Sequence, residues 1–406
     1  MTPVAISRQR SVGLALPVLF AASICHFLND ATQSLFTASY PIFRSVFDLS
    51  FGQIGLLTLA YQLSASILQP IVGLYTDRHP APYSLPVGMG ISATALVTLA
   101  YAPNYLAVVA GAALLGVGSS IFHPESSRLA RLASGGAHGL AQSIFQVGGN
   151  IGASIGPLLV AFIVLPGGQS RLAWFAALAL CGIVILTRLS RWYAGVLHDT
   201  RRFAGARPAS AAPDARIGRA MAILAALIFS KYFYIASFTS YYVFYLESRF
   251  QATQRTAQIC LFVFLGAVAA GTLIGGPVGD RIGRKTVIWG SILGILPFTL
   301  VLPYASLPTT IALSAVIGLI LASAFSAIVV YAQELMPHRI GMVSGLFFGL
   351  AFGMGGLGAA VLGVLADHTS VEFVYKVCAF LPLIGMLAAL LPETKPRVAP
   401  APVRAS

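Results

Sequence analysis

The chain has 406 residues, of which 57% are hydrophobic and only 9% are charged. Soluble domains carry about one quarter charged residues, so this composition excludes a soluble globule. The formal net charge is +13, but no soluble basic domain is present to bind nucleic acid. We therefore interpret the excess of Lys and Arg as a topology signal and as a contact with anionic lipid.

Twelve stretches are long and apolar enough to cross a bilayer, for which a helix needs about 20 residues. The first stretch is too long for a signal peptide and lacks a small-residue cleavage pattern, so we expect it to remain in the protein. An even number of spans places both termini on one side of the membrane. The predicted spans are 14–43, 51–76, 84–102, 105–130, 138–164, 172–192, 218–246, 257–279, 286–303, 309–333, 340–366 and 373–392.

The distribution of Lys and Arg predicts the orientation. With the N-terminus inside, the segments on the cytoplasmic side carry nineteen of the 25 basic residues and the opposite side carries five. Loops rich in Lys and Arg stay in the cytoplasm. The sequence therefore predicts that both termini are cytoplasmic.

A short motif occurs twice, once in each half of the chain. GGPVGDRIGRK, at Gly275–Lys285, follows the eighth predicted span, and GLYTDR, at Gly73–Arg78, follows the second. The two aspartates, Asp77 and Asp280, are 203 positions apart, which is half the chain length. A repeat of this size indicates duplication of a whole bundle, since solenoid units have about 20–50 residues.

This repeat predicts an all-α membrane protein with twelve transmembrane helices in two six-helix pseudo-repeats. A polar stretch rich in Ala, Pro, Gly and Arg separates the halves and is typical of a cytoplasmic linker. The predicted domains are an N-terminal bundle (1–193), the linker (194–217), a C-terminal bundle (218–396) and a disordered cytoplasmic tail (397–406).

The first span carries polar side chains on one face. His26, Asp30, Gln33 and Thr37 are four, three and four residues apart, which places them on the same side of a helix. A charge in hydrocarbon costs at least ~2.5–3.5 kcal/mol, so we expect this face to line a cavity between the bundles. Asp30 is thus a candidate proton carrier, and His26 and Gln33 are candidate substrate contacts. The alternative is a structural carboxylate bonded to a neighbouring helix.

The fourth span ends in a second polar cluster, with His123, Glu125 and Arg128. Glu125 and Arg128 are three residues apart, so they can form an ion pair on one helical face. Two interpretations remain open for this cluster. It is either a structural clasp or a relay for protons or substrate, with Glu125 as a second candidate proton carrier.

Two further spans carry stripes of polar side chains that step by three or four residues. These amide faces either bind a polar solute or hold neighbouring helices together. The stripes are Gln62, Ser66 and Gln69 on the second span, and Gln142, Gln146, Asn150 and Ser154 on the fifth.

Lys231 is the only basic residue deep inside a predicted span. A lone buried cation needs an anion, which Asp30, Glu125 or the substrate would supply. Tyr234 and Tyr241 lie on or near the same helical face. They are candidate substrate contacts, with core packing as the alternative.

The two copies of the loop motif resemble the signature loop of the major facilitator superfamily, and the six-plus-six layout agrees. Five further segments resemble the fosmidomycin resistance group of bacterial drug exporters. The first loop departs from the signature, because His79 and Pro80 stand where the second has Ile282 and Gly283. The five segments are HFLND (26–30), YQLSASILQP (61–70), SSIFHPESSR (119–128), QSIFQVGGN (142–150) and VYAQELMPHRIGMVSG (330–345).

This resemblance implies a gating role for both loops. Asp77 is expected to meet the start of the eleventh helix, whose N-terminal dipole attracts a carboxylate, and Asp280 is expected to meet the fifth helix. For a phosphonate substrate, Lys231 would be the point-charge partner, assisted by His123 or Arg128. The residues assigned to gating are Gly73, Asp77, Arg78, Gly276, Asp280, Arg281, Gly283, Arg284 and Lys285.

Together these features predict a secondary active transporter of the bacterial inner membrane rather than an enzyme. The resemblance implies proton-coupled efflux of a small, anionic, drug-like compound such as fosmidomycin. Proton-coupled uptake of a small polar metabolite remains an alternative, and a multipass sensor or enzyme is a further one. We expect a monomer whose partners are a small substrate, protons and lipid, with no nucleic acid, metal or other cofactor.

Overall fold

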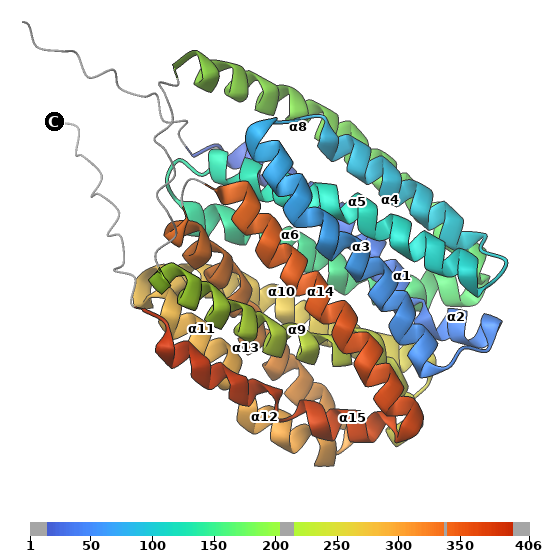
Figure 1. The fold of residues 1–406 in the computed structure, drawn as a ribbon. Coiled ribbons are helices and arrows are strands. Elements are labelled where there is room, and N and C mark those ends of the chain that lie inside the picture. The colour runs from blue at the N-terminus through green and yellow to red at the C-terminus, as the bar shows by residue number, and fades with distance from the viewer. Residues whose placement is uncertain (1–13, 204–214, 337–338, 393–406) are drawn as a thin grey trace, which may run out of the picture.

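The computed structural model describes residues 14–203, 215–336 and 339–392, and every regular element in these ranges is a helix (Figure 1). The elements are α1 (Leu16–Ala38), α2 (Tyr40–Phe47), α3 (Phe51–Arg78), α4 (Ser84–Ala100), α5 (Tyr105–Leu132), α6 (His138–Leu159), the π-helix η1 (Val160–Val164), α7 (Leu165–Gly167), the 3₁₀ helix η2 (Gln169–Phe175), α8 (Ala176–Phe203), α9 (Ala215–Phe250), α10 (Gln254–Ile282), α11 (Arg284–Leu293), α12 (Leu296–Val301), the 3₁₀ helix η3 (Leu302–Tyr304), α13 (Leu307–Leu335), α14 (Ile340–His368), α15 (Val371–Cys378) and the 3₁₀ helix η4 (Leu381–Leu390).

Ten helical segments in the described ranges are long and apolar enough to cross a membrane. Two more helices occupy the remaining predicted spans. One is α4, which is apolar but has only 17 residues. The other is α1, whose 23 residues include the polar stripe around Asp30, which lowers the mean hydropathy of the helix. The prediction of twelve spanning helices is therefore confirmed.

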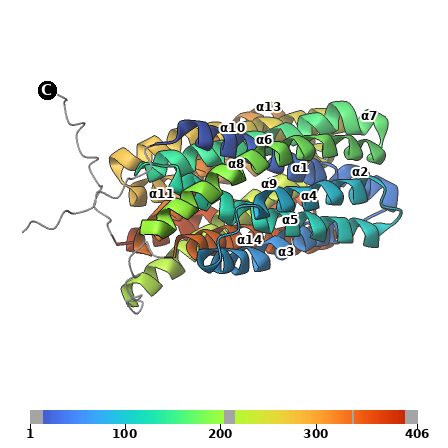
Figure 2. The ribbon, with the colours of Figure 1, turned by 90° about the horizontal axis from the view of Figure 1, so that it is seen from above.

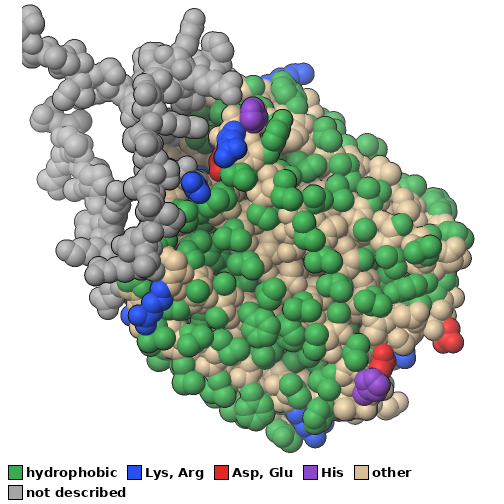
Figure 3. Space-filling model, in the orientation of Figure 1, with side chains coloured by type: hydrophobic (Ala, Val, Ile, Leu, Met, Phe, Trp, Pro, Cys, Tyr) green, Lys and Arg blue, Asp and Glu red, His purple; other side chains and the backbone are tan. Residues whose placement is uncertain are grey.

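The surface of the bundle is apolar along its middle. Figure 3 shows hydrophobic side chains over the central part of one face and charged side chains near the two ends. Large apolar side chains inside the long helices, such as Ile67, Val184 and Leu273, are more than half exposed. A soluble monomer rarely exposes so much contiguous apolar surface, whereas a bilayer covers it.

The helices run side by side along one direction in both views (Figures 1 and 2). Within the first half, α1 packs along α6 and α5 packs between α3 and α4; within the second half, α10 packs along α13. The most extensive contacts between the halves are those of α3 with α14 and of α6 with α10. The contact between the pseudo-repeats is therefore built from equivalent helices of each half.

Small residues allow α3 and α14 to approach closely. A side chain on Gly73 would collide with the main-chain oxygen of Gly341, and a side chain on Gly341 would lie 2.6 Å from the carboxylate of Asp77. Small residues at helix crossings let membrane helices pack backbone against backbone. This contact places the motif Gly73–Arg78, which forms the last turns of α3, against the first turn of α14.

Several helix ends differ from the predicted boundaries, and the predicted spans 286–303 and 373–392 are each divided into shorter helices. The first predicted span, 14–43, is divided at Ser39, where α1 ends and the short α2 begins. The predicted linker, 194–217, is helical at both ends, because α8 continues to Phe203 and α9 begins at Ala215. Its central part, 204–214, and the predicted tail, 397–406, lie outside the described residues.

Candidate functional site

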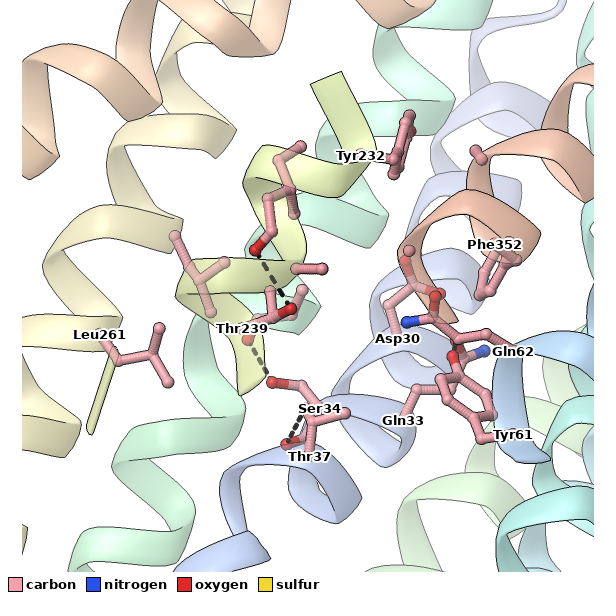
Figure 4. Close-up of a pocket in the computed structure, with 16 residues that line it drawn as sticks. Asp30, Gln33, Ser34, Thr37, Tyr61, Gln62, Tyr232, Thr239, Leu261 and Phe352 are labelled. Atoms are coloured by element: carbon pink, nitrogen blue, oxygen red, sulfur yellow. Dashed lines mark hydrogen bonds between the residues drawn. The ribbon is translucent and has the colours of Figure 1, made fainter. Parts of the chain in front are cut away.

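A cavity of about 160 Å³ lies between the two halves (Figure 4). Six helices contribute to its wall, three from each half. One acidic side chain, several amides and hydroxyls, and an apolar remainder form the lining. The lining residues are Asp30, Gln33, Ser34, Thr37, Tyr61, Gln62, Ala153, Tyr232, Ile235, Ala236, Thr239, Leu261, Leu265, Ala351, Phe352 and Gly355.

The polar face of α1 forms one side of this cavity. Asp30, Gln33 and Thr37 line it, together with Ser34, as their shared position on one helical face predicts. His26 lies one turn earlier and does not line the cavity, but its Nε2 is 3.2 Å from Oδ2 of Asp30. The predicted stripe therefore divides into a cavity-lining part and a buried part.

Asp30 lies between two histidines. Besides the contact with His26, its Oδ1 is 3.6 Å from Nε2 of His123 on α5, and Oδ1 also accepts a hydrogen bond of 3.0 Å from Asn29. Both imidazoles are only 2% exposed. One ligand atom from each of His26, Asp30 and His123 falls within 4.8 Å of the others, so the three groups form one buried cluster at the edge of the cavity.

Two glutamines offer unpaired polar atoms beside this cluster. The hydroxyl of Tyr61 donates a hydrogen bond to Oε1 of Gln33, and this leaves Nε2 of Gln33 without a partner among the described residues. Oε1 of Gln62 also has no described partner. A buried amide atom without a partner costs free energy, so a polar solute in the cavity would gain hydrogen bonds from both.

The wall opposite α1 is one face of α9. Tyr232, Ile235, Ala236 and Thr239 line the cavity and are spaced by three, one and three residues, as expected for one helical face. The sequence predicted instead that Lys231 and its aromatic neighbours face the cavity, because of their charge and their rings. These residues lie on a face of α9 that is rotated by about 100° from the cavity-lining face. The cavity-lining face of α9 could have been recognised from the small residue Ala236 and the polar residue Thr239, which share a helical face with Tyr232.

Lys231 is buried away from the cavity. Its side chain is 3% exposed, and Nζ lies 3.5 Å from the main-chain oxygen of Ala322 on α13 and 5.7 Å from the ring centres of Tyr232 and Phe325. No acidic side chain of the described residues forms an ion pair with it. The predicted pairing with Asp30 or Glu125 is not present in this conformation.

The other predicted substrate contacts on α9 lie in the core. Tyr234 packs against Phe238, and the hydroxyl of Tyr241 donates a 2.5 Å hydrogen bond to the main-chain oxygen of Ala359 on α14. Both rings belong to the hydrophobic core of the bundle. The structure therefore gives these tyrosines the packing environment that the sequence analysis kept as the alternative.

The predicted amide stripe on α6 also lies outside the cavity lining. Asn150 donates a 2.6 Å hydrogen bond to Thr272 on α10, across the contact between the halves. Gln142 accepts a 3.1 Å hydrogen bond from Ser127, and Oε1 of Gln146 has no described partner. At least Asn150 thus joins neighbouring helices, the second of the two interpretations.

A network of charged groups closes the contact between the two halves at the end where α3 finishes. Oδ2 of Asp77 accepts a 2.9 Å hydrogen bond from the main-chain nitrogen of Met342, in the first turn of α14, as the resemblance implied. Arg128 lies 3.7 Å from Asp77 and 3.9 Å from Glu125 and donates to the main-chain oxygen of Thr76. Arg128 and Glu125 therefore belong to this closure and not to the cavity wall.

Arg131 and Ser127 of α5 also contact the second half at the same end. Arg131 donates to Oε1 of Gln333 at 2.8 Å, and Nε2 of Gln333 donates to Ser344 at 2.9 Å. Ser127 lies 3.5 Å from the hydroxyl of Ser344. The first turns of α14 are thus held by residues of α3, α5 and α13.

The opposite end is closed by a matching contact. Asp367, the penultimate residue of α14, accepts hydrogen bonds from the main-chain nitrogens of Phe51 (3.0 Å) and Gly52 (2.7 Å), in the first turn of α3. Asp77 is likewise the penultimate residue of α3. Each helix of this antiparallel pair therefore places a carboxylate on the N-terminus of the other.

The remaining residues assigned to gating are placed as follows. Gly283 has φ of 92°, a left-handed conformation that favours glycine at the turn between α10 and α11. Arg284 forms an ion pair of 3.1 Å with Glu334 on α13. Arg78 is exposed and Lys285 is half-buried. The surroundings of Gly276, Asp280 and Arg281 lie outside the described part of the structure. The predicted contact of Asp280 therefore stays a prediction.

A model of the family described as Major Facilitator Superfamily matches residues 22–250 and 224–405. The chain belongs to the major facilitator superfamily. It is therefore a membrane transporter and not an enzyme, as predicted. The fold agrees with this assignment: the crystal structure of FucP, a transporter of the superfamily in the outward conformation, superposes with a TM-score of 0.67 at 14% sequence identity, covering 93% of this chain and 99% of that chain.

Two superfamily members have closely similar sequences. The fosmidomycin resistance protein of Escherichia coli (strain K12) is 60% identical over 378 residues, which is 93% of each chain. The uncharacterized MFS-type transporter YfnC of Bacillus subtilis (strain 168) is 41% identical over 380 residues, again 93% of each chain. The resemblance inferred from the sequence motifs is confirmed over nearly the whole length.

The two carboxylate contacts between α3 and α14 predict opposite effects of two matched substitutions. A charge at a helix terminus contributes about 0.3–2 kcal/mol, so Asp77→Asn and Asp367→Asn should each favour opening of their own end by about 2- to 30-fold. The measurement is labelling of a cysteine introduced at Ser34 on the cavity wall, after replacement of the four native cysteines, with a reagent confined to one side.

Asp48→Asn is the control for these variants, because Asp48 is exposed in the turn before α3 and holds neither helix end. It should leave labelling unchanged from both sides. An equal rise from both sides in either test variant would show that the carboxylates stabilise the fold without controlling access.

The surroundings of Lys231 predict a stability difference. Removing one member of a buried ion pair costs about 3–5 kcal/mol, because the other charge is left unpaired. Lys231→Met leaves no described acid unpaired, so this variant should unfold at the same or a higher temperature than the wild type. Arg128→Met leaves Asp77 and Glu125 without their cation, so this variant should unfold at a lower temperature. Thermal unfolding in detergent measures both, and a greater loss for Lys231→Met would reveal an anionic partner for this lysine.

Proposed function

We propose that this transporter expels a small anionic compound, such as fosmidomycin, in exchange for protons. One observation carries the proposal: Asp30 is the only carboxylate among the described residues that line the cavity between the halves, and hydrogen bonds join the halves at both ends of the α3–α14 pair. The substrate class comes from the name of the 60% identical relative.

Alternating access follows from the two closures in this proposal. Opening the Asp77 end exposes the cavity to one side, and opening the Asp367 end exposes it to the other, while the two repeats rock about the central site. The membrane potential supplies about 2.3 kcal/mol per charge per 100 mV, so proton entry can drive efflux without nucleotide.

Asp30 has the position required of the proton carrier. It faces the cavity on one side and the buried histidines on the other. In this exchange the proton and the substrate occupy a space of about 160 Å³ in turn, so substrate binding releases the proton from Asp30 and proton binding releases the substrate. Gln33, Gln62 and Thr37 supply neutral hydrogen-bonding groups for the substrate.

The proposed orientation places the Asp77 end and both termini in the cytoplasm. A single cysteine introduced at position 205, in a chain without the native cysteines, tests this. An impermeant thiol reagent added to intact cells should leave the cysteine unlabelled until the membrane is permeabilised, because the basic linker is retained inside. Labelling in intact cells would place the linker outside the cell and contradict the proposed orientation.

Asp30→Asn tests the proton carrier. An imposed pH difference of one unit is worth about 1.4 kcal/mol per proton, or about tenfold in the substrate gradient. Wild-type protein in liposomes should move fosmidomycin in response to the pH difference, whereas Asp30→Asn should bind and exchange fosmidomycin but ignore the gradient. Full retention of the response in Asp30→Asn would remove Asp30 from this role.

Glu125→Gln is the matched control, because Glu125 is buried and acidic but belongs to the closed end with Arg128. It should lower the yield or stability of the protein and preserve the response to the pH gradient. A lost response in Glu125→Gln with an intact one in Asp30→Asn would assign the proton to Glu125.

A further inference from the structure

We propose that His26 and His123 complete the proton site, so that each imidazole binds one proton against a different oxygen of Asp30. This inference rests on the proposed function, because it names the remaining members of the same coupling site. The sequence analysis assigned both histidines to the substrate. The structure separates them from the cavity wall and directs them at the carboxylate.

The hydrogen bond of His26 fixes which of its nitrogens carries the first proton. Nδ1 lies 2.8 Å from the main-chain oxygen of Phe145 on α6, and a carbonyl oxygen only accepts. Nδ1 therefore donates, and Nε2 of the neutral ring is a bare lone pair. This atom is buried, has no hydrogen-bond partner among the described residues and lies 3.2 Å from Oδ2 of Asp30.

His123 is fixed in the same way. Its Nδ1 lies 3.0 Å from the main-chain oxygen of Ser119, one turn earlier on α5, and 3.1 Å from the hydroxyl of that serine. When Nδ1 donates to this carbonyl, Nε2 is a lone pair 3.6 Å from Oδ1 of Asp30. Phe348 and Phe352 of α14 pack against this ring and hold its orientation.

Two lone pairs directed at an ionised carboxylate repel it. A proton placed at either contact converts the repulsion into a charge-assisted hydrogen bond. The cluster thus takes up one proton to become neutral and a second to become singly positive, with both protons between nitrogen and oxygen. The number of bound protons thus sets the charge of the cluster and the electrostatic potential in the cavity beside it.

Gly149 on α6 keeps the site open. A Cβ at this position would collide with Nε2 of His26 and would lie 2.6 Å from Oδ2 of Asp30. The space beside the two reacting atoms therefore exists only because residue 149 has no side chain. The ring of His26 is also stacked on Phe145 at 4.0 Å between centroids, so the imidazole cannot easily turn away.

Few other titratable groups face the cluster. Tyr61 of α3 and Tyr232 of α9 lie on the cavity wall beside Asp30. The nearest charged groups on the packed helices face elsewhere, because Glu125 of α5 contacts Arg128 and Lys231 of α9 contacts α13. Within the described residues, the two histidines are the bases that can share protons with Asp30.

Nitrogen-15 spectra of the histidine side chains test the site without any substrate. The protein, labelled at its seven histidines, is placed in lipid nanodiscs, and His26→Gln and His123→Gln assign the two signals. Both rings should carry the proton on Nδ1 at high pH and gain a second proton on Nε2 as the pH falls. Asp30→Asn should change the pH of that step for both rings together.

His368→Gln is the control, because His368 is exposed at the far end of α14 and should leave both signals unchanged. Two results would overturn the proposal: neutral rings that carry the proton on Nε2, or signals that do not respond to Asp30→Asn. Retention of one equivalent of a transition metal by the purified protein would also overturn it, since the three ligand atoms would then hold an ion.

Transport provides the second readout. In liposomes, His26→Gln and His123→Gln should each change the pH profile of gradient-driven fosmidomycin efflux while retaining fosmidomycin exchange without a gradient. A purely structural role would lower both by the same factor. If the wild type moves no fosmidomycin, the proposed function fails, whereas the histidine spectra still decide whether the cluster binds protons.

Discussion

The antiparallel pair α3 and α14 holds the two halves of this transporter together. Each helix ends in an aspartate that accepts hydrogen bonds from the first turn of the other: Asp77 from Met342, and Asp367 from Phe51 and Gly52. The first amides of a helix have no partner within it and carry the positive end of its dipole. The same interaction therefore joins the two halves at both ends of the α3–α14 pair.

Charge inside the bundle is kept in separate places. Arg128 gathers two carboxylates at the Asp77 end. The ion-pair partners of Asp30 among the described residues are two imidazoles, which are charged or neutral according to pH. Ion pairs between Arg and carboxylates suit a gate, because the charges of both partners stay the same while protons bind to and leave the cavity. A carboxylate with variable partners suits a coupling site, because its net charge follows proton binding. Lys231 belongs to neither group in this conformation and is surrounded by rings and a carbonyl.

Much of the fold and part of the site could be predicted. Hydropathy gave twelve spans because bilayer thickness sets helix length, and helical spacing placed Asp30, Gln33 and Thr37 on one face. The motif resemblance led to the contact of Asp77 with α14. For α9, the sequence predicted that Lys231 faces the cavity because of its charge, whereas the structure has Tyr232 on the cavity wall. Spacing defines which residues share a face, but the neighbours decide which face meets the cavity.

The sequence by itself determined the membrane location, the duplicated architecture and the transporter family, because these depend on composition, length and local motifs. Only the tertiary structure decided which polar groups meet. The contact of Asp367 with the start of α3 joins residues more than 300 positions apart, and the orientation of both imidazoles toward Asp30 depends on main-chain oxygens of α5 and α6. Such contacts arise from helix packing between distant segments, and no local pattern along the chain specifies them.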